Sequence, residues 1–272
     1  MITKNRQSIA VIIVCCACIP SGMYGQPQSK NARTVLTKML AAYEHAETYQ
    51  DSGEFRVFPR SRSVLDDRGR PQNSRLAVSF RTFFMRPKMF RFDWLNSSTK
   101  TSRYSAIWFD GEQGYIWAAD KVLGEDRFVL DRKSGFDFLI DNAINRSRGT
   151  VLTIPGLLMR SLRPYTFADD IKNLSEARII KEQLVDGEMC YVISGKASND
   201  PWLFWVGKKS SLLRKMRSVL SIGSFDEPLK RGQSNRLVAE EVHHNIRINE
   251  RIPKITFQYK PQLRANDVDL TR

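Results

Sequence analysis

The sequence predicts an α+β protein built around a single antiparallel sheet. Three observations support this fold class: one amphipathic helix precedes the first strand, runs with a two-residue period then follow one another closely, and helical spacing returns only in the middle of the chain. Most neighbouring runs have no crossover helix between them, and short connections join antiparallel strands. We therefore expect one helix, about five strands, a helical insertion, and about five or six further strands.

The first helix is expected within Ser29–Gln50. Its apolar residues recur at the spacing of one helix face, at Val35, Leu36, Met39, Leu40 and Tyr43. Two more helices are expected in the middle of the chain. One follows Ser134 as its cap, and the other has Pro155 near its start and continues through Leu157–Leu162.

The strands are predicted from alternation of apolar with polar residues. The pattern is clearest in Phe90–Trp94, where three aromatic residues alternate with Arg91 and Asp93. It returns near the C-terminus in Ile255–Tyr259. The other strand-like runs are Glu54–Phe58, Arg75–Phe84, Tyr104–Phe109, Tyr115–Ala118, Ala177–Leu184, Tyr191–Gly195, Trp202–Val206, Leu213–Leu220 and Val238–Asn249.

One short motif occurs twice, as DGEQGYIW at Asp110–Trp117 and as DGEMCYVI at Asp186–Ile193. Asp-Gly between two strands predicts a hairpin turn, because glycine readily takes the positive φ that such turns need. We interpret both copies as turns, each with its glutamate exposed at the tip. The alternative is a hydrolase that groups the acids Asp110, Glu112, Asp186 and Glu188, which requires Asp110 and Asp186 to share one buried cleft.

Catalytic and metal-binding patterns are otherwise absent from the sequence. Its three histidines are His45, His243 and His244. The last two are adjacent on a predicted strand and point to opposite faces, so they cannot readily bind one metal together. We expect His244 to be a core histidine on the face of Val242 and Ile246. We predict no catalytic residue, no metal and no cofactor, and hence no enzyme.

The N-terminus has the features of a secretory signal peptide. Basic residues precede the apolar run Ile9–Ile19, which Pro20 breaks and small residues follow. The run is too short to span a bilayer. We therefore expect a signal peptide over residues 1–25 and a single exported domain over residues 26–272, located in the periplasm. Cys18 offers an alternative, a lipid anchor. Cys190 is then the one cysteine of the mature chain, so no intramolecular disulfide is expected.

Positive charge dominates the composition. The chain of 272 residues has 43 Lys and Arg against 29 Asp and Glu, a net charge of +14. Such a surface favours an anionic membrane surface or a polyanionic envelope component, or serves solubility alone. We expect no nucleic-acid partner, because no recognition helix or RNA-binding aromatic signature is present. The protein is expected to be a monomer.

Three motifs, taken in order, resemble a known family. They are MRPKMFRF at Met85–Phe92, the Asp-Gly hairpin from Trp108 to Trp117, and ITFQYKP at Ile255–Pro261. Their order is similar to that of the LolA/LolB lipoprotein carriers and their wider superfamily, which includes sigma-factor regulator domains. The resemblance implies an incomplete antiparallel β-barrel of about 11 strands, with a strongly curved sheet closed on its concave side by the N-terminal helix and central lid helices. The long connection Arg60–Ser74 and the loop Gly223–Ser234 depart from the family pattern.

The resemblance also implies a function. The protein is expected to be a non-enzymatic carrier for an acyl lipid or a lipidated protein in the cell envelope. The alternative is an envelope sensor of the sigma-factor-regulator type without a carrier role. Arg86 corresponds to an arginine that holds the lid helices, and Phe90 to a residue that contacts acyl chains. Taken by themselves, Arg86 is an ordinary cation at a hairpin edge and Phe90 a core residue.

The sequence carries more large apolar side chains than one ordinary sheet face can hold. A curved sheet around helices can therefore enclose an apolar cavity, although most of these residues are expected to form the core. The ligand-binding residues predicted from this reasoning and from the resemblance are Arg86, Phe90, Phe92, Trp94, Trp108, Trp117, Leu157 and Leu158.

Overall fold

The computed structural model describes residues 31–59, 76–96, 103–120, 125–131, 138–141, 153–159, 167–197, 200–221 and 236–258. Several expectations fall outside these ranges and stay predictions. They are the signal peptide over residues 1–25, the anchor at Cys18, the connection Arg60–Ser74, the loop Gly223–Ser234, and the aromatic end of the closing motif, Tyr259–Pro261.

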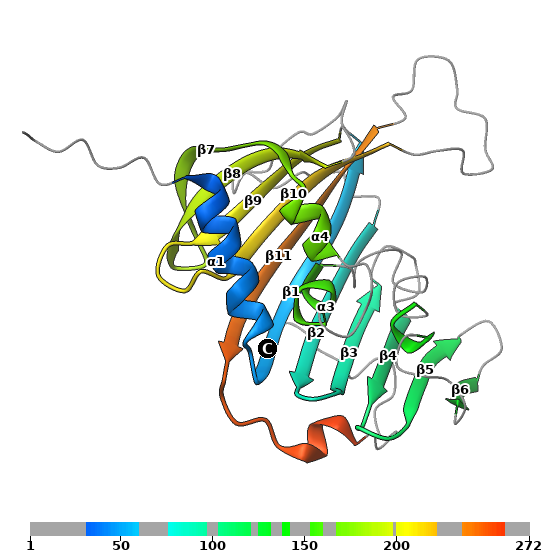
Figure 1. Cartoon of the computed structure of the whole chain (residues 1–272). Coiled ribbons are helices and arrows are strands. Elements are labelled where there is room, and N and C mark those ends of the chain that lie inside the picture. The colour runs from blue at the N-terminus through cyan, green and yellow to red at the C-terminus, as the bar shows by residue number, and fades with distance from the viewer. Residues whose placement is uncertain are drawn as a thin grey trace, which may run out of the picture.

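Eleven strands form one antiparallel sheet (Figure 1). In chain order they are β1 (Thr48–Pro59), β2 (Leu76–Met85), β3 (Met89–Asn96), β4 (Arg103–Phe109), β5 (Gly114–Asp120), β6 (Glu125–Asp131), β7 (Ser175–Val185), β8 (Glu188–Ala197), β9 (Asp200–Gly207), β10 (Leu213–Ser221) and β11 (Arg236–Ile248). Their order across the sheet is β6-β5-β4-β3-β2-β1-β11-β10-β9-β8-β7. Because β6 and β7 form two open edges, the barrel is incomplete, and the predicted fold class is confirmed.

Strands β1 and β11 join the two arms of the sheet at its centre. Both are long, and they pair antiparallel from Tyr49 opposite Ile248 to Pro59 opposite Leu237. The register shifts between Gln50 and Ser52, which places one extra residue of β11 opposite β1. Every other pairing joins strands that are neighbours in the sequence.

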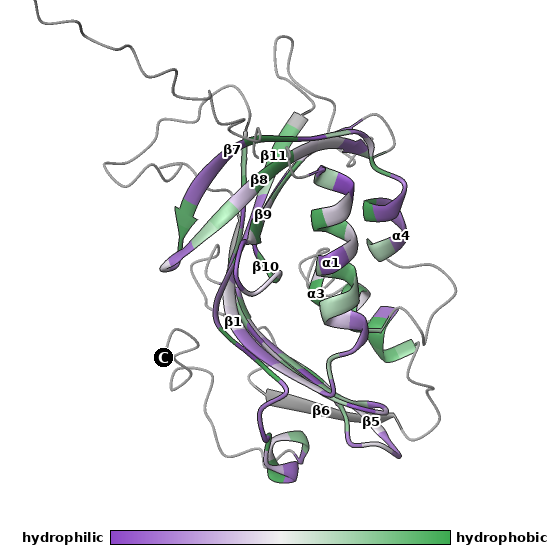
Figure 2. Cartoon of the chain, turned by 60° about the vertical axis from the view of Figure 1, so that its left-hand side comes forward, coloured by the Kyte–Doolittle hydropathy of each residue, from purple (hydrophilic) through white to green (hydrophobic). Residues whose placement is uncertain are grey.

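Three helices, α1 (Ala32–Glu44), α3 (Thr153–Leu158) and α4 (Phe167–Lys172), lie along the concave side of the sheet and are called the lid helices here (Figure 2). Asn31 caps α1, because its side-chain oxygen accepts a hydrogen bond from the backbone N–H of Arg33 at 2.9 Å. The predicted apolar face of α1 is buried as expected. The lid helices also contact one another, α1 with α3 and α4, and α3 with α4.

The main hydrophobic core lies between the lid helices and the sheet. The lid-facing residues of β2, β3 and β4 form a continuous row across the sheet. Phe84 of β2 lies opposite Phe90 of β3, and Phe90 lies opposite Phe109 of β4. Phe84 and Phe90 are fully buried, as is Met39 of α1. The described interior is therefore filled by the protein's own side chains in this closed form.

Two glycines let the covering segments approach the sheet closely. A Cβ at Gly114 of β5 would lie 2.0 Å from Leu139, in the helical turn over residues 138–141. A Cβ at Gly195 of β8 would lie 1.9 Å from Leu174, which follows α4. A side chain at either position would require Leu139 or Leu174 to shift.

The structure corrects the predicted C-terminal strand. The 3₁₀-helix η3 (Lys254–Phe257) replaces it. In a strand, Ile255 and Phe257 would share one face, whereas residues two apart on a 3₁₀-helix point to different sides. Accordingly, Phe257 is fully buried while Ile255 is 56% exposed. Strand β6 and helix α4 were not predicted, and α4, with six residues, is too short to show a helical period.

Candidate binding site between the lid helices and the sheet

Five of the eight predicted ligand-binding residues belong to the main core cluster between the lid helices and the sheet. Phe90, Phe92 and Trp94 lie on β3, Leu157 and Leu158 lie on α3, and all five are at most 3% exposed. The rings of Phe92 and Trp94 lie 5.4 Å apart, and Phe80 stacks on Phe92 at 5.7 Å. This group can offer a ligand aromatic and aliphatic contacts, provided that the lid opens.

Trp108 and Trp117 do not belong to this group, which corrects their placement. They form a separate cluster with Tyr104 and Ala106. On β4, Ile107 and Phe109 face the lid, so the alternation of the strand turns Trp108 to the opposite face. There the guanidinium of Arg91 lies over the Trp108 ring, 6.0 Å from its centroid. A ligand under the lid helices would not contact either tryptophan.

Arg86 connects the β2–β3 turn to the ends of two lid helices. Its Nε donates to the carbonyl oxygen of Ala46 at 2.8 Å, and its Nη2 donates to that of Glu44 at 2.5 Å, at the end of α1. Nη2 also lies 3.5 Å from the carbonyl oxygen of Leu158, the last residue of α3. Helix C-termini present unpaired carbonyls and partial negative charge, which a guanidinium satisfies. Arg86 therefore holds α1 and α3 at one edge of the site.

Arg33 makes a second connection at the other end of α1. Its Nη1 donates to the carbonyl oxygen of Lys172, the last residue of α4, at 2.5 Å, and its Nη2 donates to that of Leu174. The two arginines thus fasten α1 at both ends, Arg33 to α4 and Arg86 to α3.

A chain of buried polar side chains runs beneath the lid, and we call it the inner polar network. It consists of Tyr49 and Asp51 on β1, His243 and Glu241 on β11, and Thr153 on α3. Tyr49 donates to Asp51 Oδ2 at 2.9 Å, and the same oxygen lies 2.8 Å from His243 Nδ1. His243 Nε2 lies 3.3 Å from Glu241 Oε1, and Thr153 donates to Glu241 Oε2 at 2.5 Å. The network therefore ties lid helix α3 to the centre of the sheet.

The side chains of the inner polar network are almost completely buried. The side chain of His243 is 0% exposed, and those of Asp51 and Glu241 are 0% and 2% exposed. Burial alone lowers the pKa of His243, but hydrogen bonds and charges from Asp51 and Glu241 outweigh it and raise the pKa to about 9. Burial and the Asp51 charge raise the pKa of the Tyr49 phenol. The imidazole is thus protonated at neutral pH, and the phenol is neutral.

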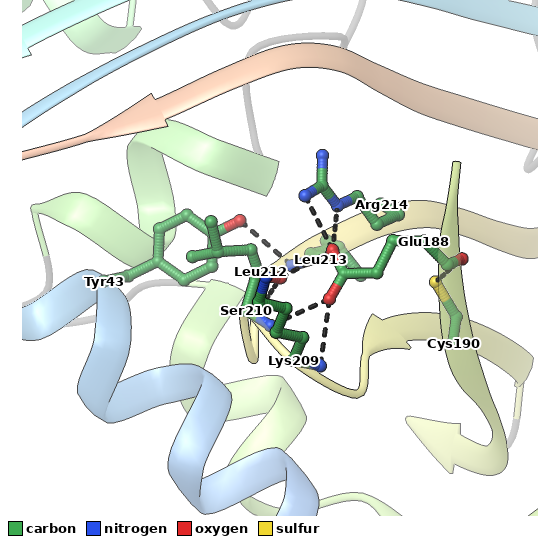
Figure 3. Close-up of polar contacts among 8 residues, drawn as sticks. All are labelled: Tyr43, Glu188, Cys190, Lys209, Ser210, Leu212, Leu213 and Arg214. Carbon is green, nitrogen blue, oxygen red and sulfur yellow. Dashed lines mark hydrogen bonds and ion pairs between the residues drawn. The ribbon is translucent and has the colours of Figure 1, made fainter. Parts of the chain in front are cut away.

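Tyr43 of α1 is a further polar contact between lid and sheet (Figure 3). Its ring is fully buried, and its hydroxyl oxygen accepts a hydrogen bond from the backbone N–H of Leu213, at the start of β10, at 3.1 Å. The ring lies 5.6 Å from that of Tyr49, so α1 touches the inner polar network as well. Burial raises the pKa of Tyr43 well above its usual value.

The two Asp-Gly motifs form hairpin turns, as predicted. Gly111 and Gly187 both have positive φ, at 108° and 78°, and the turns join β4 to β5 and β7 to β8. Asp110 and Asp186 lie in different arms of the sheet and share no cleft. The condition set for the hydrolase alternative is therefore not met.

The second glutamate of these motifs does not lie exposed at the turn tip, which corrects the prediction for Glu188. Its carboxylate accepts hydrogen bonds from the backbone N–H groups of Lys209 and Ser210, at 3.0 and 2.8 Å, and from Arg214 Nε at 2.9 Å (Figure 3). Burial raises the pKa of Glu188, but Ser210 and Arg214 outweigh it and lower the pKa below its usual value. Glu188 thus ties the β7–β8 turn to the β9–β10 turn, whereas Glu112 is exposed as predicted.

The histidine prediction must also be corrected. His243, not His244, is the buried residue, and His244 is 39% exposed and lies 3.3 Å from Asp186. Val242 indicated the wrong face, because the inward residues here are Glu241 and His243. Ile246 packs against the main core, but the register shift between β1 and β11 separates it from His244. A search for apolar alternation cannot identify an inward face that carries charge. The sequence signal that could have revealed this polar face was the presence of two acids and two histidines within one short strand run.

The described residues show no three His, Cys, Asp or Glu side chains placed to hold a metal ion. In the same parts of the chain, no helix is long and apolar enough to cross a membrane.

Comparison with known proteins finds no matching family model and no matching curated protein. Several solved structures are similar in fold. LprF from Mycobacterium bovis is 8% identical, with 82% of this chain and 94% of that chain covered and a TM-score of 0.45. A chain of the Pseudomonas aeruginosa MucA/MucB complex is 8% identical, with 84% of this chain covered and a TM-score of 0.42, and this protein spans 61% of that chain.

A third similar structure is described as a LolA superfamily protein from Nitrosomonas europaea. It is 12% identical, with 84% of this chain and 98% of that chain covered and a TM-score of 0.30. This is the superfamily that the sequence motifs resemble.

Proposed function

We propose that this protein is a non-enzymatic binding protein of the cell envelope that takes up acyl chains between its lid helices and the concave face of the sheet. The ligand would be a lipid or a lipidated protein. The observation that carries the proposal is the position of Arg86, which joins the ends of α1 and α3 at the edge of an interior lined by Phe90, Phe92 and Leu158. An exported location rests on the predicted signal peptide.

Binding requires the lid helices to move, because the closed interior is filled. Breaking the Arg86 contacts frees the ends of α1 and α3 together, and acyl chains then replace the contacts between Leu157 or Leu158 and the β3 aromatics. Each buried methylene contributes about 0.8 kcal/mol. A chain of ordinary length can therefore offset the lost lid packing.

A second candidate is an envelope sensor that binds a protein partner and carries no cargo. The observation in its favour is the filled interior, in which Met39, Phe84, Phe90 and Leu158 are fully buried. In this case the lid helices stay closed, and the partner binds the outside of the molecule.

Native mass spectrometry of the protein purified from an envelope fraction tests the proposal. We expect a co-purifying acyl lipid or lipoprotein. Arg86→Gln should release it faster, because α1 and α3 lose their shared anchor. Arg247→Gln is the matched control, since Arg247 is 60% exposed and its ion pair is with Glu250 rather than with a lid helix. Phe90→Glu, checked for folding by circular dichroism, should abolish cargo binding.

The opposite result is equally clear. If the folded protein is purified without a bound lipid and also does not bind added monoacylglycerol or lipopeptide, the carrier function is excluded and the sensor function is favoured.

A further inference from the structure

Three polar atoms of the lid-facing sheet surface are buried without a hydrogen-bond partner in the described part of the chain. They are Asp51 Oδ1, Thr82 Oγ1 and His243 Nε2, and the last of these lies 3.3 Å from Glu241 Oε1. Asp51 and Thr82 are direct neighbours across β1 and β2, and Thr82 is fully buried. A buried carboxylate oxygen without a donor is costly, since such groups are almost always satisfied in folded proteins. The pair therefore presents an unused acceptor and an unused hydroxyl in the middle of the proposed acyl-binding interior.

Acidic groups outnumber basic ones at this place. Among the described residues, the buried acidic and histidine residues are Asp51, Asp93, Glu240, Glu241 and His243. Asp93 pairs with Arg91, and Glu240 pairs with Lys215 and Arg217, all away from the inner polar network. The two carboxyl groups of Asp51 and Glu241 thus share the one imidazole of His243.

Opening of the lid leaves a further carboxyl oxygen without a hydrogen-bond donor. Thr153 is the donor to Glu241 Oε2, and it belongs to α3. When α3 lifts from the sheet, Glu241 loses this hydrogen bond while it stays on β11. An incoming molecule with a hydrogen-bond donor can replace it, whereas a purely hydrocarbon chain cannot, and an anionic group would be repelled.

We propose that Asp51, Thr82 and Glu241 form a site for the head of an amphiphilic ligand, and that this head donates hydrogen bonds and carries no negative charge. An ammonium group fits best, because it supplies several donors and forms charge-assisted hydrogen bonds with carboxyl groups. A hydroxyl head is the next best. This inference rests on the proposed function, since the acyl chain of the same ligand would occupy the aromatic interior beside the site.

Three probes with one alkyl chain test the inference on the unmodified protein: dodecylamine, dodecanol and dodecanoate. Their dissociation constants are measured by displacement of a fluorescent lipid. We expect dodecylamine to bind about 10- to 100-fold more tightly than dodecanoate, the ratio for one or more hydrogen bonds to a charged group, with dodecanol between them. Equal affinities, or the tightest binding by dodecanoate, would overturn the inference and leave the proposed function standing. If none of the three binds, the proposed function fails as well.

Variants test whether the difference in affinity between the probes arises at the proposed site. Asp51→Asn keeps the shape and removes the charge, so dodecylamine should lose its advantage over dodecanol. Asp93→Asn is the matched control, because Asp93 is equally buried but lies on the other face beside Arg91, and it should leave the ratio unchanged. Thr82→Val removes the unpaired hydroxyl while the Asp51–His243 contact remains. It should weaken binding of dodecylamine and dodecanol several-fold, and it serves as the test if Asp51→Asn does not fold. An unchanged probe order in both folded site variants would contradict the site.

Discussion

Glu240 and Glu241 are neighbours on β11, yet they lie in opposite kinds of surroundings. Glu240 points away from the lid and is held by Lys215 and Arg217, at 2.9 and 2.5 Å. Glu241 points under the lid, where its partners are the hydroxyl of Thr153 and the imidazole of His243. Both glutamates are buried, but only the outer one has more positive than negative charge around it.

The difference shows how one sheet can separate stability from function. The partners of Glu240 come from the neighbouring strand β10 and stay in place when the helices move. Those of Glu241 include a residue of the lid itself. The outer pairing belongs to the permanent scaffold, whereas the inner one is complete only while the lid is closed.

The largest effect is expected from His243→Leu. Loss of the imidazolium leaves Asp51 and Glu241 buried without a cation, which should lower the free energy of unfolding by about 3–5 kcal/mol. Urea denaturation measures this loss. His244→Leu is the control, because its partly exposed contact with Asp186 should contribute less than about 1 kcal/mol. Equal losses in the two variants would contradict the inner placement of His243.

The two faces of β11 should respond to opposite ends of the pH scale. The pKa of His243 is raised from 6.5 to about 9, so its contribution is complete below pH 6.5 and is lost as the pH rises to 9. This loss amounts to about 3 kcal/mol. For Glu240, burial raises the pKa, but Lys215 and Arg217 outweigh it and lower the pKa below 4.5. Its contribution is present above pH 4.5 and is lost as the pH falls further.

Urea denaturation across this pH range separates the two groups. His243→Leu should flatten the alkaline decline and Glu240→Gln the acid decline. An alkaline decline that persists in His243→Leu assigns it to another group.

Thr153→Val should have an intermediate effect. The substitution keeps the volume but leaves Glu241 Oε2 without its donor, which should cost about 1–3 kcal/mol. If Thr153 ties the lid to the sheet, hydrogen exchange of the backbone amides in α3 should accelerate more than exchange in β10. Uniform acceleration across the molecule would indicate a general loss of stability instead.

The smallest effect is expected from Lys215→Met on the outer face. The ammonium group of Lys215 lies over the Trp205 ring, 5.2 Å from its centroid, and a methionine of similar length keeps a side chain there. Glu240 retains Arg217, so the loss should be about 1 kcal/mol or less. Chemical denaturation beside Thr153→Val measures it. A loss larger than that of Thr153→Val would reverse the ranking of the two faces.

Much of the fold could be predicted from the sequence, because many of its strands alternate apolar with polar residues. Phe90, Phe92 and Trp94 alternate with Arg91 and Asp93, and the structure confirms that β3 separates them onto two faces. The Asp-Gly pairs identified two turns for an equally local reason.

The candidate site was harder to predict, because its polar part depends on contacts between distant segments. Asp51 and His243 are 192 residues apart, and no local pattern relates them. Thr153 stands two residues before Pro155, at the start of a predicted helix, and its hydrogen bond to Glu241 follows only from the way α3 lies on the sheet. Trp108 and Trp117 were misplaced because the size of a side chain does not indicate which face of a strand carries it.

The pairing of β1 with β11 has a consequence for the order of folding. Glu47, just before β1, donates to the side chain of Asn249, just after β11, across 202 residues. The strands β2–β6 and β7–β10 can each form as meanders from neighbouring hairpins, but the centre of the sheet must wait until almost the whole chain is available. High contact order of this kind slows folding. A chain emerging from a ribosome or a translocation channel would therefore carry two partly formed arms, and it would gain its lid-facing interior only at the last step.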